Sequence, residues 1–248
     1  MPYSEQQVIS KQNWSDNIFS FRTTKPEDFQ FKNGQFVTLG LRSDNKLIPR
    51  AYSIVSSNDD SNLEFLSIVV PDGPLTSKLV LIEEGSLVYI NSKSTGSLTL
   101  DHVKPGRHLY MIATGTGIAP FISLIRGKDA FNRFEKVILV HSVRHVNGLV
   151  FRDELESMQN DNFKYVPTVT REPFRNTHRG SDLFLSGELT SDLKLASPDP
   201  KLDRVLICGN PGMNQDLSNS LLEKGWTMTN FKGLGNFSIE QAFVIHKK

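Results

Sequence analysis

LYMIATGTGIAPFISLIR, residues 109–126, predicts a strand, a glycine loop and a helix in immediate succession. Its first four residues are an apolar run of strand length, and apolar side chains recur at helical spacing from Phe121 to Ile125. Such a loop lets a phosphate approach the backbone, because glycine has no Cβ, and the helix start offers free N–H groups to an anion. Pro120 suits the first helical turn, where its missing N–H is no loss. The pattern G-x-G-x-x-P departs from the standard dinucleotide fingerprint at its last position, and many α/β proteins use a glycine turn simply to enter a helix.

Basic residues after the next two predicted strands favour a dinucleotide with an extra phosphate. The strands are residues 136–140 and 163–169, and a protein that binds plain NAD would place Asp or Glu after the first of them. The residues found there are His141, Ser142 and Arg144 after the first strand, and Thr170, Arg171 and Arg179 after the second. Charge-assisted hydrogen bonds contribute roughly 1.5–3 kcal/mol each, so two arginines would favour NADP by about a hundredfold to ten-thousandfold. Any one of these arginines alone is better explained as a solvated residue on an exposed loop.

The composition is that of an ordinary globular protein with room for one large or two ordinary domains. The chain has 248 residues, of which 38% are hydrophobic and 22% charged. Its net charge of +1 disfavours general binding of nucleic acid. The first residues, MPYSEQQ, lack the basic start and apolar core of a secretion signal, and no apolar run approaches the ~20 residues of a membrane span. These features predict a soluble, cytoplasmic protein without a membrane partner.

Cysteine and histidine usage excludes some chemistries. The single cysteine, Cys208, excludes an intrachain disulfide and a cysteine-ligated iron–sulfur cluster within this chain. The only close histidine pair, His141 and His145, sits at a predicted strand end without an HExxH pattern. No metal site is therefore predicted.

The amino-terminal part predicts a small antiparallel β-barrel of six strands with one short helix. The predicted strands are residues 8–14, 18–23, 34–41, 51–56, 63–70 and 87–90. Residues 75–81 predict the helix, whose start carries Thr76 and Ser77. This helix start is either a second anion site or an ordinary capped helix that closes the barrel.

The carboxyl-terminal part alternates strand and helix, which predicts a doubly wound, mostly parallel sheet. Pro105-Gly106 marks the joint, and we expect a barrel domain at residues 1–101 and an α/β domain at 102–248. A further strand, residues 204–208, ends in Gly209 and places Cys208 at the ligand edge of the sheet, where a lone cysteine is more often a small core residue. The nearby acidic side chains Asp153, Glu154 and Glu156 are interpreted as a solvated helix face.

Four short motifs in a fixed order resemble those of the ferredoxin–NADP reductase family. They are Arg50-Ala51-Tyr52-Ser53, Gly73-Pro74-Leu75-Thr76-Ser77, the glycine loop from Gly115 to Phe121, and Cys208-Gly209. Each motif alone is modest, but their ordered coincidence is specific, and the resemblance covers essentially the whole chain.

The resemblance implies a tightly bound, non-covalent FAD on the barrel. Arg50, Thr76 and Ser77 would share its pyrophosphate, which combines a bidentate cation with oriented backbone donors. Tyr52 would lie against the isoalloxazine ring, and the Ser53 hydroxyl would bond near the ring nitrogen that accepts hydride. Five further cofactor-binding residues are implied: Ala51, Ile68, Val69, Gly73 and Leu75.

The resemblance also implies NADPH on the second domain and a covering carboxyl-terminal tail. NADPH would bind through Thr116, Gly117, Arg144, Thr170, Arg171 and Arg179. Its nicotinamide would reach the flavin near Cys208 and Gly209. The sequence Glu240-Gln241-Ala242-Phe243 is similar to a bacterial subgroup in which Ala242 and Phe243 would lie over the flavin and the tail would fold toward the adenine. Phe243 would then have to move for hydride transfer, or it simply closes the last strand as a core residue.

The implied activity is electron transfer between NADPH and ferredoxin or flavodoxin, by an enzyme that is monomeric in the family's usual manner. Two alternatives remain open. An NADPH:free-flavin reductase would use a related barrel and release its flavin on dialysis. A non-catalytic NADP- or flavin-binding module would bind nucleotide without flavin reduction.

Overall fold

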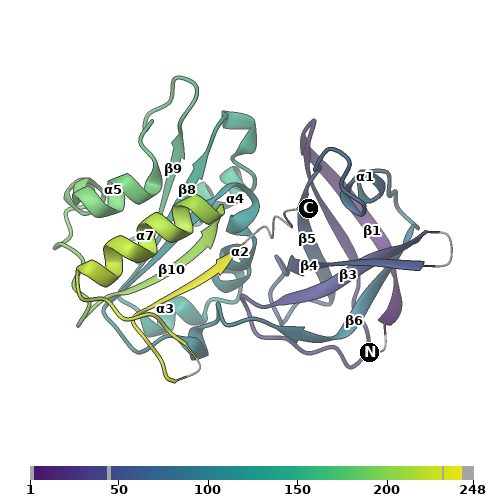
Figure 1. Ribbon diagram of the computed structural model, residues 1–248, viewed down its shortest axis with the longest axis horizontal. Coiled ribbons are helices and arrows are strands. Elements are labelled where there is room, and N and C mark those ends of the chain that lie inside the picture. Colours follow the sequence, from purple (N-terminus) through teal and green to yellow (C-terminus); the bar gives the residue numbers. More distant parts are fainter. Residues whose placement is uncertain (1–2, 44–45, 231, 242–248) are drawn as a thin grey trace.

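The computed structural model describes residues 3–43, 46–230 and 232–241, which fold into a β-barrel lobe and an α/β lobe (Figure 1). The barrel lobe comes first in the chain, and the short 3₁₀ helix Leu100–His102 lies in the connection between the lobes. The strands of the barrel are β1 (Tyr3–Ser15), β2 (Ile18–Thr24), β3 (Phe36–Ser43), β4 (Lys46–Ser53), β5 (Asn62–Ile68) and β6 (Leu87–Thr95).

The six strands pair antiparallel in the order β4-β3-β6-β1-β2-β5. The sheet curls until its two edge strands approach each other, where Ile54 and Phe65 form an isolated bridge and the Val55 N–H donates to the Glu64 carbonyl at 2.8 Å. Alternate side chains fill the interior, among them Leu39 and Ile90, which are fully buried. The predicted antiparallel barrel architecture is confirmed.

Strand β4 begins five residues earlier than the sequence predicts. The expected strand was 51–56, but Lys46 already pairs with Ser43 of β3. This earlier start is possible because β4 lies at the edge of the sheet. There the missing N–H of Pro49 costs no ladder bond, and exposed residues are tolerated.

Helix α1 (Thr76–Leu79) is shorter than the predicted helix at 75–81. Leu75 and Leu79 pack into the barrel core on one side of the helix. Leu81 is 75% exposed and has nothing to pack against. The apolar pattern therefore continues past the point at which burial stops favouring a helix.

The second lobe contains five parallel strands in the order β11-β10-β7-β8-β9. They are β7 (His108–Thr114), β8 (Lys136–Val143), β9 (Phe163–Val169), β10 (Arg204–Gly209) and β11 (Phe237–Gln241). The helices are α2 (Ala119–Arg126), α3 (Asp129–Arg133), α4 (Arg152–Ser157), α5 (Gly180–Ser186), α6 (Glu188–Asp192) and α7 (Pro211–Glu223). The predicted doubly wound parallel sheet is confirmed.

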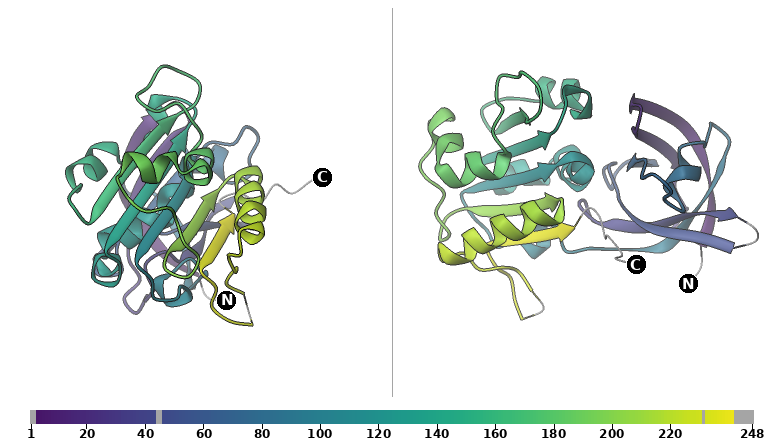
Figure 2. Two further views of the ribbon diagram at one scale, coloured as in Figure 1. Left: turned by 90° about the vertical axis from the view of Figure 1, so that its left-hand side faces the viewer. Right: turned by 45° about the horizontal axis from the view of Figure 1, so that its top comes forward.

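Helices cover both faces of this sheet (Figure 2). Leu109 and Met111 of β7 face the side covered by α2, α3 and α4, whereas Tyr110 and Ile112 face α5, α6 and α7. A strand buried on both faces must be apolar throughout, which explains the continuous apolar run at the start of residues 109–126. All carboxyl ends of the strands meet at one edge, where ligands of such sheets bind. None of the helices in the described part of the chain is both long and apolar enough to cross a membrane.

Candidate functional site

The glycine loop follows β7 directly, as the sequence predicts. A 3₁₀ helix, Gly115–Ile118, leads into α2, and Pro120 lies in the first helical turn. Gly115 has a φ of +54°, the left-handed region in which glycine carries no Cβ penalty. An added Cβ at Gly117 would lie 2.4 Å from the Cys208 carbonyl oxygen, so only glycine lets β10 pass this close. The loop is therefore seated tightly between β7 and the end of β10.

His141 and Ser142 lie beneath this edge, inside β8, because the strand runs to Val143 and not to residue 140 as predicted. His141 is fully buried, with Nε2 3.0 Å from the Gly115 carbonyl oxygen and Nδ1 3.3 Å from the Tyr165 hydroxyl. Burial lowers the pKa of His141 to about 4, so its imidazole is neutral at physiological pH. The Ser142 hydroxyl accepts the Gly180 N–H at 2.8 Å. Both side chains support neighbouring backbone.

Three predicted phosphate-binding arginines gather where β8 and β9 end. The backbone N–H of Arg171 donates to the backbone carbonyl of Arg144 at 3.0 Å, so these two residues lie on adjacent chain segments. The backbone N–H of Thr170 donates in the same way to the carbonyl of Val143. Arg179 occupies the N-cap position of α5, whose first N–H is bound by the Ser142 hydroxyl of β8. All three arginines are exposed, and none enters an ion pair among the described residues. An exposed cluster of like charge favours a multivalent anion.

The motif on β4 lies at the barrel edge. Arg50 and Ala51 are exposed, and Arg50 Nη1 donates to the Pro49 carbonyl at 2.7 Å. Tyr52 points the other way and is only 9% exposed, with its hydroxyl 3.1 Å from that of Ser67. Burial raises the pKa of Tyr52, so the phenol stays neutral.

The second barrel motif forms a compact turn before α1. The Thr76 hydroxyl bonds to the Val70 backbone, and the Ser77 hydroxyl donates to the Gly73 carbonyl at 2.7 Å. Leu75 is 1% exposed and packs in the barrel core, so only its backbone can face a ligand. The predicted contacts Ile68 and Val69 are half-buried at the end of β5 and just beyond it.

The two lobes meet at Ser53, Cys208 and Glu240. Cys208 pairs with Glu240 in the parallel register of β10 and β11, and the Ser53 hydroxyl of the barrel donates to Glu240 Oε1 at 3.5 Å. Burial raises the pKa of Glu240 to about 7, and the bond from Ser53 opposes this shift only in part. Burial, reinforced by the charge of Glu240, raises the pKa of the Cys208 thiol well above its usual value. Glu240 was not predicted as a site residue, because only the fold brings it close to Ser53.

We expect Glu240→Gln to stabilise the protein at alkaline pH but not near pH 5. The folded pKa of Glu240 exceeds its unfolded value, so the folded state holds the extra proton and stability falls as pH rises from about 4.5 through about 7. Above that range, removal of the buried charge should gain about 1–3 kcal/mol. Thermal unfolding at about pH 5 and about pH 8 measures the difference. Exposed Glu223→Gln is the matched control, and an equal gain at both pH values would contradict the assignment.

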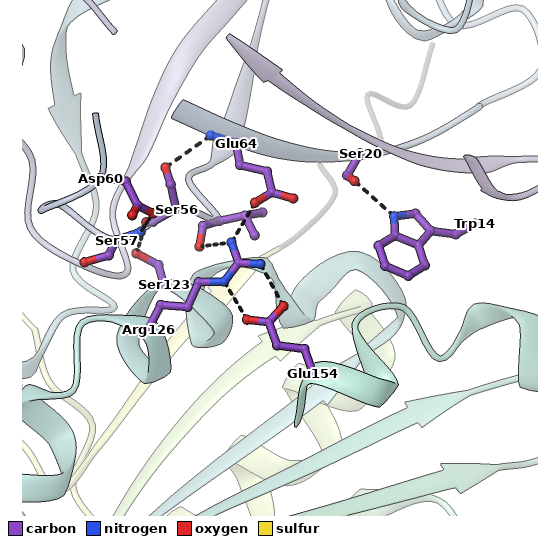
Figure 3. A network of polar contacts seen from close by, with 10 residues as sticks. Trp14, Ser20, Ser56, Ser57, Asp60, Glu64, Ser123, Arg126 and Glu154 are labelled. Atoms are coloured by element: carbon purple, nitrogen blue, oxygen red, sulfur yellow. Dashed lines mark hydrogen bonds and ion pairs between the residues drawn. The ribbon is translucent and has the colours of Figure 1, made fainter. Parts of the chain in front are cut away.

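A second contact between the lobes centres on Arg126, at the end of α2 (Figure 3). Its guanidinium donates to both carboxylate oxygens of Glu154 on α4 at 2.8 Å, and Nη1 donates to Glu64 of β5 at 2.6 Å. The same guanidinium lies 5.2 Å from the centre of the Phe151 ring. Although burial opposes the charged form, Glu154 and Glu64 raise the pKa of Arg126. The interpretation of Glu154 as a solvated residue is therefore wrong, because it takes part in a bridge between the lobes.

Other predicted residues divide into those the structure places and those it does not describe. Gly209 ends β10, where an added Cβ would lie 2.1 Å from the Thr114 hydroxyl oxygen. Ala242 and Phe243, the predicted flavin contacts of the tail, lie outside the described residues. Within the described part of the chain, no group of three His, Cys, Asp or Glu side chains is arranged to hold a metal ion.

A β-barrel with an exposed arginine is joined to a parallel sheet with a glycine loop and an arginine cluster. This combination defines a two-domain oxidoreductase that binds a flavin and a nucleotide. Family models agree, because residues 4–100 match the oxidoreductase FAD-binding domain and residues 111–219 match the oxidoreductase NAD-binding domain.

The chain belongs to the ferredoxin–NADP reductase family. It is 45% identical to the ferredoxin–NADP reductase of Pseudomonas aeruginosa, with 98% of both chains covered. It is 42% identical to the flavodoxin/ferredoxin–NADP reductase of Rhodobacter capsulatus, covering 96% of this chain and 93% of that one. A crystal structure of a ferredoxin NADP⁺ reductase from Neisseria gonorrhoeae with bound FAD and NADP superposes with a TM-score of 0.93 at 30% identity, covering 98% of this chain and 100% of that one.

Proposed function

We propose that this chain is an FAD-dependent reductase that transfers electrons between NADPH and a ferredoxin or flavodoxin. The observation that carries the proposal is the junction of the lobes, where Ser53 of the barrel motif contacts Glu240 of β11, which pairs with Cys208 of β10. A hydride donor bound on one lobe and a flavin bound on the other would come together at such a junction. Relatives named above are called ferredoxin–NADP reductase and flavodoxin/ferredoxin–NADP reductase, which supports the same activity here.

The barrel edge fits FAD by its chemistry. Arg50 is an exposed cation on β4 that enters no ion pair among the described residues, and it precedes Tyr52 and Ser53 on the same strand. We assign Arg50 and the backbone of the turn from Gly73 to Ser77 to the cofactor's pyrophosphate, and Ala51, Tyr52, Ser53, Ile68, Val69 and Leu75 to the rest of its site. When bound, FAD supplies a centre that takes up a hydride and releases electrons singly.

The α/β edge fits NADPH. We assign Thr116 and Gly117 to the pyrophosphate, and Arg144, Thr170, Arg171 and Arg179 to the adenosine end with its additional phosphate. Guanidinium groups bind phosphate oxygens in a fork-like geometry, which suits a terminal phosphate that approaches from solvent. The corresponding domains are residues 1–101 for FAD and 102–248 for NADP, a division that the limits of the two family models support.

The chain's own residues at the junction align the reactants and control protons. The Cys208 thiol is fully buried and neutral, so it packs beneath the junction and is not a nucleophile. The Glu240 carboxyl can hold or release a proton near neutral pH at Oε1, next to the Ser53 hydroxyl. The hydride step itself needs no strong acid or base, and the protein's contribution is alignment.

We infer a monomeric, cytoplasmic enzyme whose protein partner is an acidic carrier. The test is reduction of purified ferredoxin and flavodoxin by NADPH, followed spectroscopically at rising salt. Apparent affinity should fall as salt rises, because the attraction between exposed charges is screened beyond about 8–10 Å. An affinity that salt leaves unchanged would contradict electrostatic attraction between the enzyme and an acidic carrier, and failure to reduce either carrier would contradict the proposed function.

A further inference from the structure

His141 is a buried polar residue that the proposed chemistry does not use directly. It follows Val137, Ile138, Leu139 and Val140 on β8, all of which are fully buried, and is itself 0% exposed. A buried imidazole forgoes hydration, so both nitrogens need partners. They find Tyr165 and the carbonyl of Gly115, the first residue of the glycine loop.

The partners define the proton on the ring. A carbonyl oxygen only accepts, so Nε2 must carry the hydrogen and donate to Gly115. The neutral ring then has a free lone pair on Nδ1, which accepts from the Tyr165 hydroxyl. Burial, which keeps the pKa near 4, maintains this single tautomer across the physiological range.

The bond to Gly115 sets the direction of the next N–H group. The peptide that joins Gly115 to Thr116 is trans, so its carbonyl and its N–H point in opposite directions. Because the Gly115 carbonyl points toward buried His141, the backbone N–H of Thr116 points away from the interior of the sheet. Thr116 lies in the first turn of the 3₁₀ helix, where N–H groups lack intrahelical acceptors, and its side chain is partly exposed.

The other side of the loop is anchored by separate contacts. The Thr114 hydroxyl accepts from the Asn210 backbone N–H at 2.9 Å, and Gly117 rests against the backbone of β10. A left-handed residue such as Gly115 has wide conformational freedom, and the bond from His141 adds a side-chain restraint on its carbonyl to the i→i+3 pattern of the 3₁₀ helix. His141 thus ties this peptide to β8, the neighbouring strand of the sheet.

We propose that His141 is a positioning residue that aims the Thr116 N–H at the pyrophosphate of the bound nucleotide. This inference rests on the proposed function, because it takes the glycine loop as the pyrophosphate site. His141 touches no substrate and acts through one backbone peptide.

Two ligands separate this role from general support of the domain. NADP⁺ spans both the glycine loop and the arginine cluster, whereas 2′-AMP carries only the phosphate that the arginine cluster would bind. In the FAD-loaded His141→Phe protein, calorimetric titration should show NADP⁺ binding weakened about 10–100-fold, the effect of losing one hydrogen bond to a charged group. Binding of 2′-AMP should stay within about twofold of the wild type, because Arg144, Arg171 and Arg179 remain in place.

The conservative variant His141→Gln should recover most NADP⁺ affinity, because its amide N–H can still donate to Gly115. Tyr165→Phe removes only the hydroxyl at Nδ1 and should weaken NADP⁺ about 2–5-fold with 2′-AMP unchanged. This variant decides the question if His141→Phe does not fold.

Unaltered NADP⁺ binding in His141→Phe, or equal loss of both ligands, would overturn the positioning role. Unaltered NADP⁺ binding in Tyr165→Phe would overturn it if His141→Phe is unfolded. A wild-type protein that binds neither ligand would instead refute the proposed function.

Discussion

Replacing Arg144 and Arg171 together by glutamine is expected to lower the preference for NADPH over NADH by about a hundredfold to ten-thousandfold. The two residues are joined by a backbone hydrogen bond, and both are exposed at the end of the sheet. Each would lose a charge-assisted bond to the terminal phosphate, while NADH, which lacks that phosphate, loses nothing there. The ratio of kcat/KM for the two nucleotides measures the effect.

Arg175 provides the matched control for this experiment. It is exposed on the same loop, but its guanidinium is already bound to Glu156 at 3.0 Å. Arg175→Gln should therefore leave the nucleotide preference within about threefold of the wild type. If the double variant loses activity equally with NADPH and NADH, the arginine cluster is not the phosphate site.

Replacing Arg126 by leucine is expected to lower Tm by roughly 5–15 °C and to weaken the coupling between the lobes. The substitution leaves Glu64, whose side chain is 12% exposed, and Glu154 facing each other without a cation. Breaking a buried ion pair costs about 3–5 kcal/mol, and partial exposure of this one reduces the figure to about 2–4 kcal/mol. Calorimetry should show the transition broaden or split, because Glu64 and Glu154 belong to different lobes.

Arg133→Leu is the control, because among the described residues Arg133 forms an ion pair only with exposed Asp101, at 3.9 Å. Such a surface pair contributes about 0–1 kcal/mol. A loss of stability in Arg126→Leu no larger than in Arg133→Leu would contradict the interpretation of Arg126 as a bridge between the lobes.

Features encoded in short stretches could be predicted from the sequence. Residues 163–169 were predicted as a strand and form β9 with the same limits, because the segment is rich in the aromatic and β-branched residues that favour strands. The glycine loop at Gly115 and Gly117 was predicted from its flanking segments, because an apolar run of strand length precedes it and apolar residues at helical spacing follow it. The order of the motifs then predicted both lobes.

Features that depend on distant residues could not be predicted. Ser53 and Glu240 are separated by 187 positions and Arg126 and Glu64 by 62, so no local pattern joins them. His141 was placed beyond the end of its strand, because polar residues interrupt the apolar run from which the strand was predicted. The start of β4 was missed because edge position, which tolerates Pro49, is a property of the whole sheet.

The central claim is that this chain is a flavoprotein reduced by NADPH. The most direct measurement is an anaerobic visible spectrum of the purified protein, before and after one equivalent of NADPH and again with NADH. We predict a flavin spectrum that survives dialysis and is bleached rapidly by NADPH and slowly by NADH. A colourless protein that fails to take up added FAD, or a flavin that NADPH leaves oxidised, would contradict the account.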